Sequence, residues 1–153
     1  MNIPELQQKA ESGSVVAQSM LGLCYLYGRE VEVDYKEALR LLSIAKDKGA
    51  SRAIVNLAHM YAEGFGVPKD LHKAIRFYEA VAKVEVRAQL ELGRIYSRGL
   101  GVPADPEAAL RWYSAAAARE GGVNDSVTAA FVGALTFDEI KEAKAYVAGA
   151  TLT

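Results

Sequence analysis

The chain has 153 residues, 51% of them hydrophobic, and its 18 basic and 19 acidic residues leave a net charge of −1. A chain of this length can fold as one domain without a metal or disulfide, and its balanced charge excludes a general electrostatic attraction to nucleic acid or anionic lipid. The single cysteine, Cys24, excludes an internal disulfide and suits a reducing compartment. No segment resembles a membrane span or a signal peptide. The sequence therefore predicts a cytoplasmic protein without membrane insertion, or a periplasmic or secreted one if a signal peptide has been removed.

A sequence motif recurs three times, at offsets of 36 residues (17 to 53) and then 35 residues (53 to 88). A period of about 20 to 50 residues is typical of stacked supersecondary units. The members of the motif are Ala17, Leu21, Gly22, Tyr25 and Gly28, then Ala53, Leu57, Ala58, Tyr61 and Gly64, and finally Ala88, Leu92, Gly93, Tyr96 and Gly99.

The apolar residues of each unit have helical spacing. Ala17, Leu21 and Cys24 share one face of a helix with a period of 3.6 residues, and a second helix follows with Ala38 and Leu42 on its apolar face. Each unit is therefore predicted to be an antiparallel helical hairpin, which makes the chain all-α, an α/α solenoid with about nine helices.

Polar and small residues mark where these helices begin and where they approach each other. Asp34, Asp70 and Asp105 precede the second helices and are expected to be N-caps. Gly22 and Gly93 lie inside first helices, where glycine costs stability, so we expect a close approach of the paired helix at these positions.

The third unit, from Ala88 to Ala117, contains almost the whole of a known pattern: Ala, Leu-Gly, Tyr and Gly-x-Gly-Val-Pro, then Asp, Trp-Tyr and Ala-Ala. It resembles the Sel-one-like repeat (SLR), of the tetratricopeptide-like superfamily. The resemblance implies stacked helical hairpins that bind other proteins. Such bacterial proteins typically act as adaptors or regulators, and some act as host-interaction or immunity factors.

We expect a single repeat domain with capping segments at both ends. Asn2 with Glu5, and Thr136 with Glu139, have the spacing of capping boxes that begin terminal helices. The predicted boundaries are an N-terminal capping helix in 1–13, repeats in 14–50, 51–85 and 86–120, and a degenerate repeat with a C-terminal capping helix in 121–153.

Specificity is expected where the three first helices differ, on the concave face that they line in such a solenoid. This stripe is apolar at one end and arginine-rich at the other, and predicts a groove for a peptide or partner segment with an apolar anchor and an acidic part. A solvated face without a partner is the alternative interpretation. Tyr27 and Arg94 are the leading candidates in a stripe that comprises Val16, Met20, Leu23, Tyr27, Arg52, Asn56, His59, Glu63, Arg87, Glu91, Arg94 and Arg98.

Two other functions are weighed against a non-enzymatic interaction module. His59 and Glu63, four residues apart on one helix, could belong to an enzyme site in the groove, although the helix supplies no further metal ligands. Phe131, Phe137 and Tyr146 could join copies of the chain through the C-terminal cap. We expect no metal or cofactor, no nucleic-acid partner, and a monomer, with a dimer as the alternative; Cys24 is expected in the core.

Overall fold

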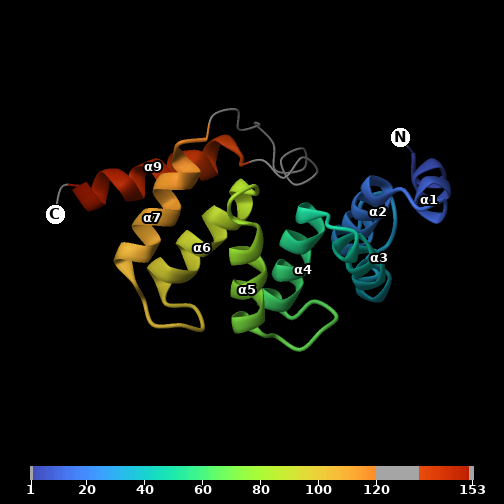
Figure 1. Cartoon of the computed structure of the whole chain (residues 1–153), viewed down its shortest axis with the longest axis horizontal. Coiled ribbons are helices and arrows are strands. Elements are labelled where there is room, and N and C mark those ends of the chain that lie inside the picture. Colours follow the sequence, from blue (N-terminus) through green and yellow to red (C-terminus); the bar gives the residue numbers. More distant parts are fainter. Residues whose placement is uncertain (1, 120–134, 152–153) are drawn as a thin grey trace. The chain divides into compact units, whose positions relative to one another are not determined.

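The computed structural model describes residues 2–119 and 135–151, and eight α-helices lie within them (Figure 1). The prediction of an all-α repeat fold is confirmed. Most of the predicted degenerate helix, residues 120–134, lies outside the described residues. The helices are α1 (Ile3–Glu11), α2 (Val15–Tyr27), α3 (Tyr35–Asp47), α4 (Ser51–Glu63), α5 (Leu71–Val81), α6 (Val86–Arg98), α7 (Pro106–Ala117) and α9 (Phe137–Thr151).

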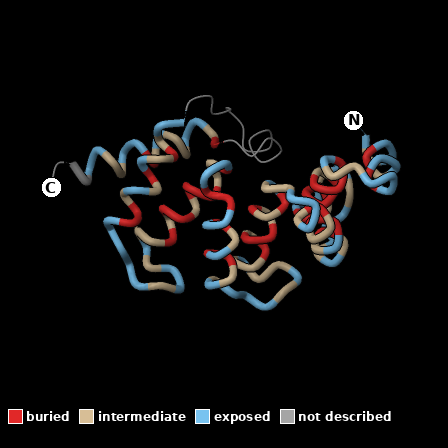
Figure 2. The backbone as a smooth tube through the Cα atoms, in the orientation of Figure 1, coloured by how far each residue is buried: buried red, intermediate tan, exposed pale blue. Residues whose placement is uncertain are grey.

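The chain divides within α5 into two compact units, residues 1–77 (unit 1) and residues 78–153 (unit 2). In unit 1, α2 and α3 form an antiparallel hairpin, α1 packs against α2, and α4 stacks on α3. In unit 2, α6 and α7 form the hairpin and α9 packs against α7. Buried positions recur in each helix from α2 to α7, as expected for stacked repeats (Figure 2).

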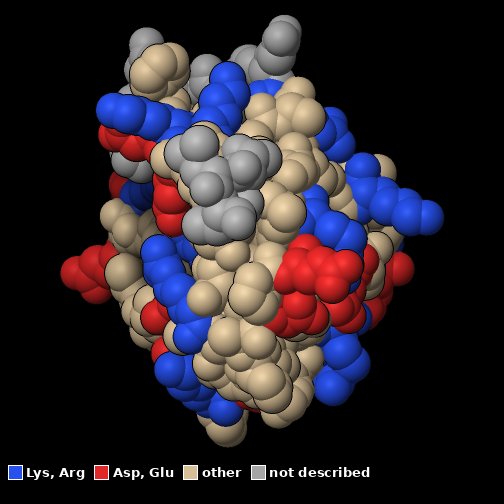
Figure 3. Space-filling model, turned by 90° about the vertical axis from the view of Figure 1, so that its left-hand side faces the viewer, with Lys and Arg blue, Asp and Glu red and all other residues tan. Residues whose placement is uncertain are grey.

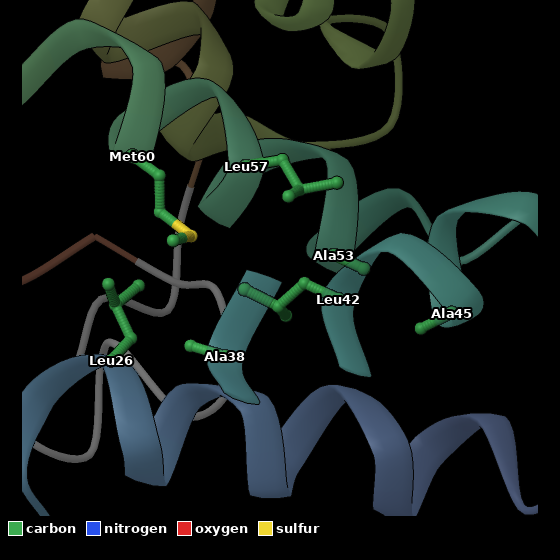
Figure 4. Packing of buried hydrophobic residues seen from close by; sticks show 7 residues of the cluster. All are labelled: Leu26, Ala38, Leu42, Ala45, Ala53, Leu57 and Met60. Carbon is green, nitrogen blue, oxygen red and sulfur yellow. The ribbon is translucent and has the colours of Figure 1, made fainter. Parts of the chain in front are cut away.

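The core of unit 1 lies where α2, α3 and α4 meet. Leu42 of α3 and Met60 of α4 are fully buried, and they pack in one cluster with Leu26 of α2 and Leu57 of α4 (Figure 4). Small residues between them, Ala38, Ala45 and Ala53, let the helix backbones approach each other. A Leu→Ala substitution in such a core typically costs about 2–5 kcal/mol, so these contacts dominate the stability of the hairpin.

The glycines inside the first helices are required by close packing, as predicted. A Cβ atom added at Gly22 would lie 2.8 Å from Cγ of Leu42, and one added at Gly93 would lie 3.0 Å from the ring of Tyr113. The first distance would force Leu42 to shift, and the second is tighter than most Cβ contacts and would require the Tyr113 ring to move slightly. The intrinsic cost of glycine in a helix is therefore offset by the approach of the second helix of each hairpin.

The predicted N-caps are also confirmed. Asp34 accepts a hydrogen bond from the Glu37 amide at 3.0 Å, Asp70 one from Lys73 at 3.0 Å, and Asp105 one from Ala108 at 3.0 Å. At the start of α1, Asn2 accepts from the Glu5 amide at 2.9 Å. Each such bond pairs a backbone amide that the helix itself leaves unpaired, and is typically worth about 1 kcal/mol.

A buried glutamine ties two of the first helices to the helix that precedes each. Gln18 donates from Nε2 to the Ala10 carbonyl at 3.1 Å, and Gln89 donates to the Ala82 carbonyl at 2.8 Å. The second repeat has Ile54 at this position. The repeats thus share a packing framework but differ in how polar groups tie one helix to the next.

The loop inside each repeat needs two residues with positive φ. The first is Gly28, Gly64 or Gly99, which ends the first helix in the left-handed conformation. The second is Gly66 in the second repeat (φ 68°) and Gly101 in the third (φ 70°). The first repeat has Glu30 there, at φ 58°, so the loop keeps its path without the glycine that normally permits it.

Candidate functional site

The predicted stripe of unit 1 is placed by α2 and α4. Tyr27 is 39% exposed at the end of α2, and Arg52 and Glu63 are exposed on α4. Met20, Asn56 and His59 are half-buried, and Asn56 donates from its side chain to the Arg52 carbonyl at 3.0 Å. Leu23 is only 3% exposed and lies in the core, so it is not part of the accessible stripe.

Tyr27 lies at the edge of an aromatic cluster. Its ring centroid is 6.1 Å from that of His59, which contacts Phe65 edge-on at 5.6 Å. Phe65 stacks on Tyr35 at 5.1 Å, with the rings 5° from parallel, and the Arg29 guanidinium lies 5.4 Å from the Tyr27 centroid. We call Tyr27, His59, Phe65 and Tyr35 the aromatic cluster. It presents a packed aromatic surface with one exposed ring, the type of anchor found at the centre of protein interfaces.

The sequence reasoning did not identify Phe65 and Tyr35 as part of this surface. Both lie at loop ends, Phe65 directly after α4 and Tyr35 at the start of α3. Phe65 stands in a repeat position that Leu100 fills in the third unit. This change of residue type between repeats is the sequence signal that could have identified Phe65 as part of the surface.

In unit 2 the predicted arginines of α6 are engaged by α9. Arg87 binds both carboxylate oxygens of Glu139, at 3.0 and 2.9 Å. Arg94 contacts Glu142 at 2.8 Å and Glu91 on its own helix at 2.9 Å, and Arg98 lies 3.4 Å from Glu142. The third-repeat part of the stripe is therefore a cross-helix ion-pair network, formed by Arg87, Glu91, Arg94, Arg98, Glu139 and Glu142.

The charged groups of this network are partly buried. The Arg94 side chain is 21% exposed and that of Glu139 is 18% exposed. Burial opposes the charge of Arg94, but the hydrogen bond to Glu142 and the nearby carboxylates outweigh it and raise its pKa. Burial likewise opposes the charge of Glu139, but hydrogen bonds from Arg87 and Thr136 lower its pKa. Both groups are therefore held in their charged forms.

Acid should weaken the attachment of α9. The pKa of Glu139 is below its ordinary value of 4.5 in the folded chain. The ionised group therefore stabilises unit 2 above that value, and this contribution is lost as the pH falls below 4.5 through the lower folded pKa. Urea unfolding of wild type and Glu139→Gln should show a stability difference near pH 7 that shrinks below about pH 4. Glutamine preserves the capping-box spacing with Thr136, so an unchanged difference would contradict the assignment.

The structure places His59 and Glu63 in different surroundings. His59 packs between the rings of Tyr27 and Phe65, and Glu63 is exposed. No group of three or more His, Cys, Asp or Glu residues that could hold a metal ion occurs within residues 2–119 and 135–151. Cys24 is buried in the core as predicted, and burial raises the pKa of its thiol, which disfavours a nucleophilic thiolate.

The residues predicted for self-association have different surroundings. Phe137 is 66% exposed at the start of α9, whereas the Tyr146 ring packs against Tyr113 with centroids 4.5 Å apart. Phe131 lies outside the described residues. Only Phe137 thus offers an apolar surface at this end of the described chain.

Unit 1 also has an open hollow of about 440 Å³ that the sequence did not predict. Its floor includes Leu21 and Leu41, and its rim carries Gln7, Tyr25 and the ion-paired Arg40. The side-chain amide of Gln7 donates to the Tyr25 hydroxyl at 3.4 Å across it. The rim groups are therefore largely engaged with one another.

The charge distribution and helix lengths bear on other kinds of partner. Basic and acidic side chains are interspersed on the face seen in Figure 3. This face is therefore not uniformly basic. Among the helices of the described residues, none has the length and apolar character needed to span a bilayer.

Comparison with protein families and known proteins gives a consistent result. The Sel1 repeat profile matches residues 15–49, 51–83 and 86–120, so three copies cover most of the chain. A curated relative from Arabidopsis thaliana, the ERAD-associated E3 ubiquitin-protein ligase component HRD3B, is 35% identical over 80 residues. That match covers 52% of this chain but 13% of the relative, so the chain spans only about an eighth of the relative's length.

Two crystal structures have the same fold. A Sel1 repeat protein from Oxalobacter formigenes is 40% identical, with a TM-score of 0.63, and the match covers 78% of this chain and 90% of that protein. A protective antigen of uropathogenic Escherichia coli with an SLR fold is 32% identical, with a TM-score of 0.71, over 97% of this chain and 33% of the antigen. The helix stacking described above is therefore also that of experimentally determined structures.

Proposed function

The chain belongs to the Sel1 repeat family, and we propose that it is a non-enzymatic protein-interaction module that binds a segment of another protein through the exposed stripe of unit 1. The observation that carries this proposal is the exposed ring of Tyr27 on the aromatic cluster. A partially exposed tyrosine supported by other rings can bury a large contact area with little loss of side-chain entropy.

The stripe around Tyr27 suits a peptide-like partner of mixed character. Arg52 and Glu63 are exposed on the neighbouring helix, so polar groups border the aromatic surface. An apolar side chain of the partner would pack on Tyr27, and its polar groups would meet this border. This division between an apolar centre and a polar rim is typical of protein interfaces.

The relatives support a role within protein assemblies. HRD3B of Arabidopsis thaliana is named as a component of an E3 ubiquitin-protein ligase, and the similar protein of uropathogenic Escherichia coli is a protective antigen. An adaptor or regulator function agrees with the role that is named for HRD3B. A host-interaction function agrees with the description of the Escherichia coli protein as a protective antigen. In both cases the repeats would act by binding rather than by catalysis.

Site-specific photo-crosslinking tests the proposed surface. A photoreactive phenylalanine analogue replaces Tyr27, and the full chain is irradiated in lysate of the source cells. We expect a covalent adduct with one predominant protein, identified by mass spectrometry. A chain with Arg52→Ala and His59→Ala in addition should give much less adduct, because it loses the side chains that border the anchor.

The matched control places the same analogue at Lys36, an exposed position on α3 that is not part of the stripe. Equal adducts from positions 27 and 36, or no adduct from position 27, would reject binding through this stripe. Circular dichroism of each variant confirms that the helices are retained.

A further inference from the structure

We propose that the arginine face of α6, formed by Arg87, Arg94 and Arg98, is a receptor for an acidic amphipathic helix of another protein, and that α9 occupies it in the absence of that protein. This inference rests on the proposed interaction function and adds a partner class and a competing segment. It concerns unit 2 alone.

The first support is the pattern of charges. The three arginines lie seven and four residues apart on α6, so they share one helix face. Glu139 and Glu142 lie three residues apart on α9 and meet this face with contacts of 2.9, 2.8 and 3.4 Å. Bidentate arginine–carboxylate pairs such as Arg87 with Glu139 add geometric specificity as well as energy. α9 therefore shows what kind of helix the face accepts.

The second support comes from comparison of the repeats. The positions of Arg87, Arg94 and Arg98 correspond to Val16, Leu23 and Tyr27 in the first repeat, where α4 stacks on the α2–α3 hairpin without an arginine at any of them. Stacking of a helix on a hairpin thus does not require the arginines. The second repeat has Arg52, His59 and Glu63 at these positions, so only Arg87 has an arginine counterpart there. The presence of Arg94 and Arg98 in the third repeat alone indicates a selective role beyond packing.

The third support is that ion pairs carry part of the attachment of α9, beside its apolar contacts. Ala143 is its only fully buried residue among the described side chains, whereas α6 buries six residues. Ile140, Tyr146 and Val147 are only partly buried against the core of unit 2. α9 is therefore held by ion pairs as well as by these apolar contacts, and another helix with the same carboxylate spacing could replace the ion pairs.

The occupant that these contacts specify is a helix with two carboxylates three residues apart, beside a small residue that permits close approach to α7. When it binds, Glu139 and Glu142 would leave the arginines and α9 would be released. The competition between the two helices would set the apparent affinity of the chain for its partner.

The test uses the full chain and a labelled peptide of residues 135–151, acetylated and amidated at its ends, as the probe. The variant Glu139→Gln with Glu142→Gln neutralises α9 and leaves the arginines in place. We expect the peptide to bind this variant at least about tenfold more tightly than wild type, as measured by fluorescence anisotropy. Hydrogen exchange should show that peptide binding releases α9 in wild type and leaves α2 to α4 unchanged.

Two matched controls accompany the peptide-binding test. Lys141→Gln with Lys144→Gln changes the same number of charges on the exposed side of α9, and should bind the peptide as wild type does. A peptide with both glutamates replaced by glutamine should bind at least about tenfold more weakly. If the double variant Glu139→Gln with Glu142→Gln loses protection from hydrogen exchange in α6 and α7, unit 2 itself is destabilised. The single variant Glu142→Gln is then measured in its place.

Equal peptide binding by wild type and the glutamate variant, or no binding by either, would overturn the proposal and make α9 a permanent cap. Dimerisation of wild type with exchange of α9 would also overturn it, because the occupant would then be a second copy of this chain. The peptide probe comes from this chain and tests unit 2 alone. Neither of these results would therefore affect the outcome of the crosslinking test at position 27.

Discussion

Gly66→Ala should lower the free energy of unfolding of unit 1 by about 3 kcal/mol, through two separate effects. Gly66 has φ of 68°, a conformation that costs an L-residue roughly 1–2 kcal/mol. An added Cβ would also lie 2.5 Å from Cβ of Tyr35, an atom fixed to the backbone of α3 that cannot swing away. Relief would require the loop to move and would disturb the stacking of Tyr35 on Phe65. Urea unfolding followed by circular dichroism measures the loss.

Two matched substitutions separate these effects. Gly49→Ala carries the same backbone strain, with φ of 85°, but nothing lies within 4 Å of the added atom, so it should cost only about 1 kcal/mol. Glu30→Gly relieves strain at the equivalent loop position of the first repeat and should stabilise the unit by about 0.5–1 kcal/mol. Equal losses for the two alanine variants would show that the contact with Tyr35 is not restrictive.

Arg94→Ala should destabilise unit 2 by about 2 kcal/mol. The substitution leaves three carboxylates, Glu91, Glu139 and Glu142, without the cation that they share. Breaking a fully buried pair costs about 3–5 kcal/mol, and partial solvent access reduces that value here. Hydrogen exchange of α6, α7 and α9, together with urea unfolding, measures the effect and should place the largest loss of protection in α9.

The control for this prediction is Arg111→Ala on α7. Arg111 pairs with Glu107 on the same helix at 3.8 Å, and both side chains are mostly exposed, so its loss should change stability by less than about 0.5 kcal/mol. Similar effects of the two substitutions would mean that the network on α6 contributes no more than a surface ion pair.

The fold was predictable because its determinants are local and are repeated. Gly22 and Gly93 each report a close helix approach, and Asp34, Asp70 and Asp105 each mark the start of a second helix. A motif that recurs in register reduces the ambiguity of any single position. The helical segments and most of their capping interactions could therefore be predicted from residues within one repeat.

The site could be predicted only in part, because its contacts join residues that no period relates. Arg94 was identified on its helix face, but its partner Glu142 lies 48 residues further along the chain and outside the regular repeats. Leu23 matched the spacing of the stripe, yet the packing of unit 1 buries it. Spacing along one helix specifies which residues share a face, but the neighbouring helix determines whether that face remains accessible.

The combination of ion pairs and apolar contacts that holds α9 also affects how its release would respond to solvent conditions. The denaturant dependence and the heat-capacity change of an opening reaction both scale with the surface that it exposes. Separation of α4 from the α2–α3 hairpin exposes large side chains such as Leu42, Leu57 and Met60, so that reaction would depend steeply on urea and temperature. Release of α9 also exposes apolar side chains, such as Ala143 and the Tyr146 ring that packs on Tyr113, but in addition it separates opposite charges, so it would depend on ionic strength as well as on urea. One chain would thus contain one unit whose opening responds mainly to denaturant and a second unit whose opening responds to both denaturant and salt.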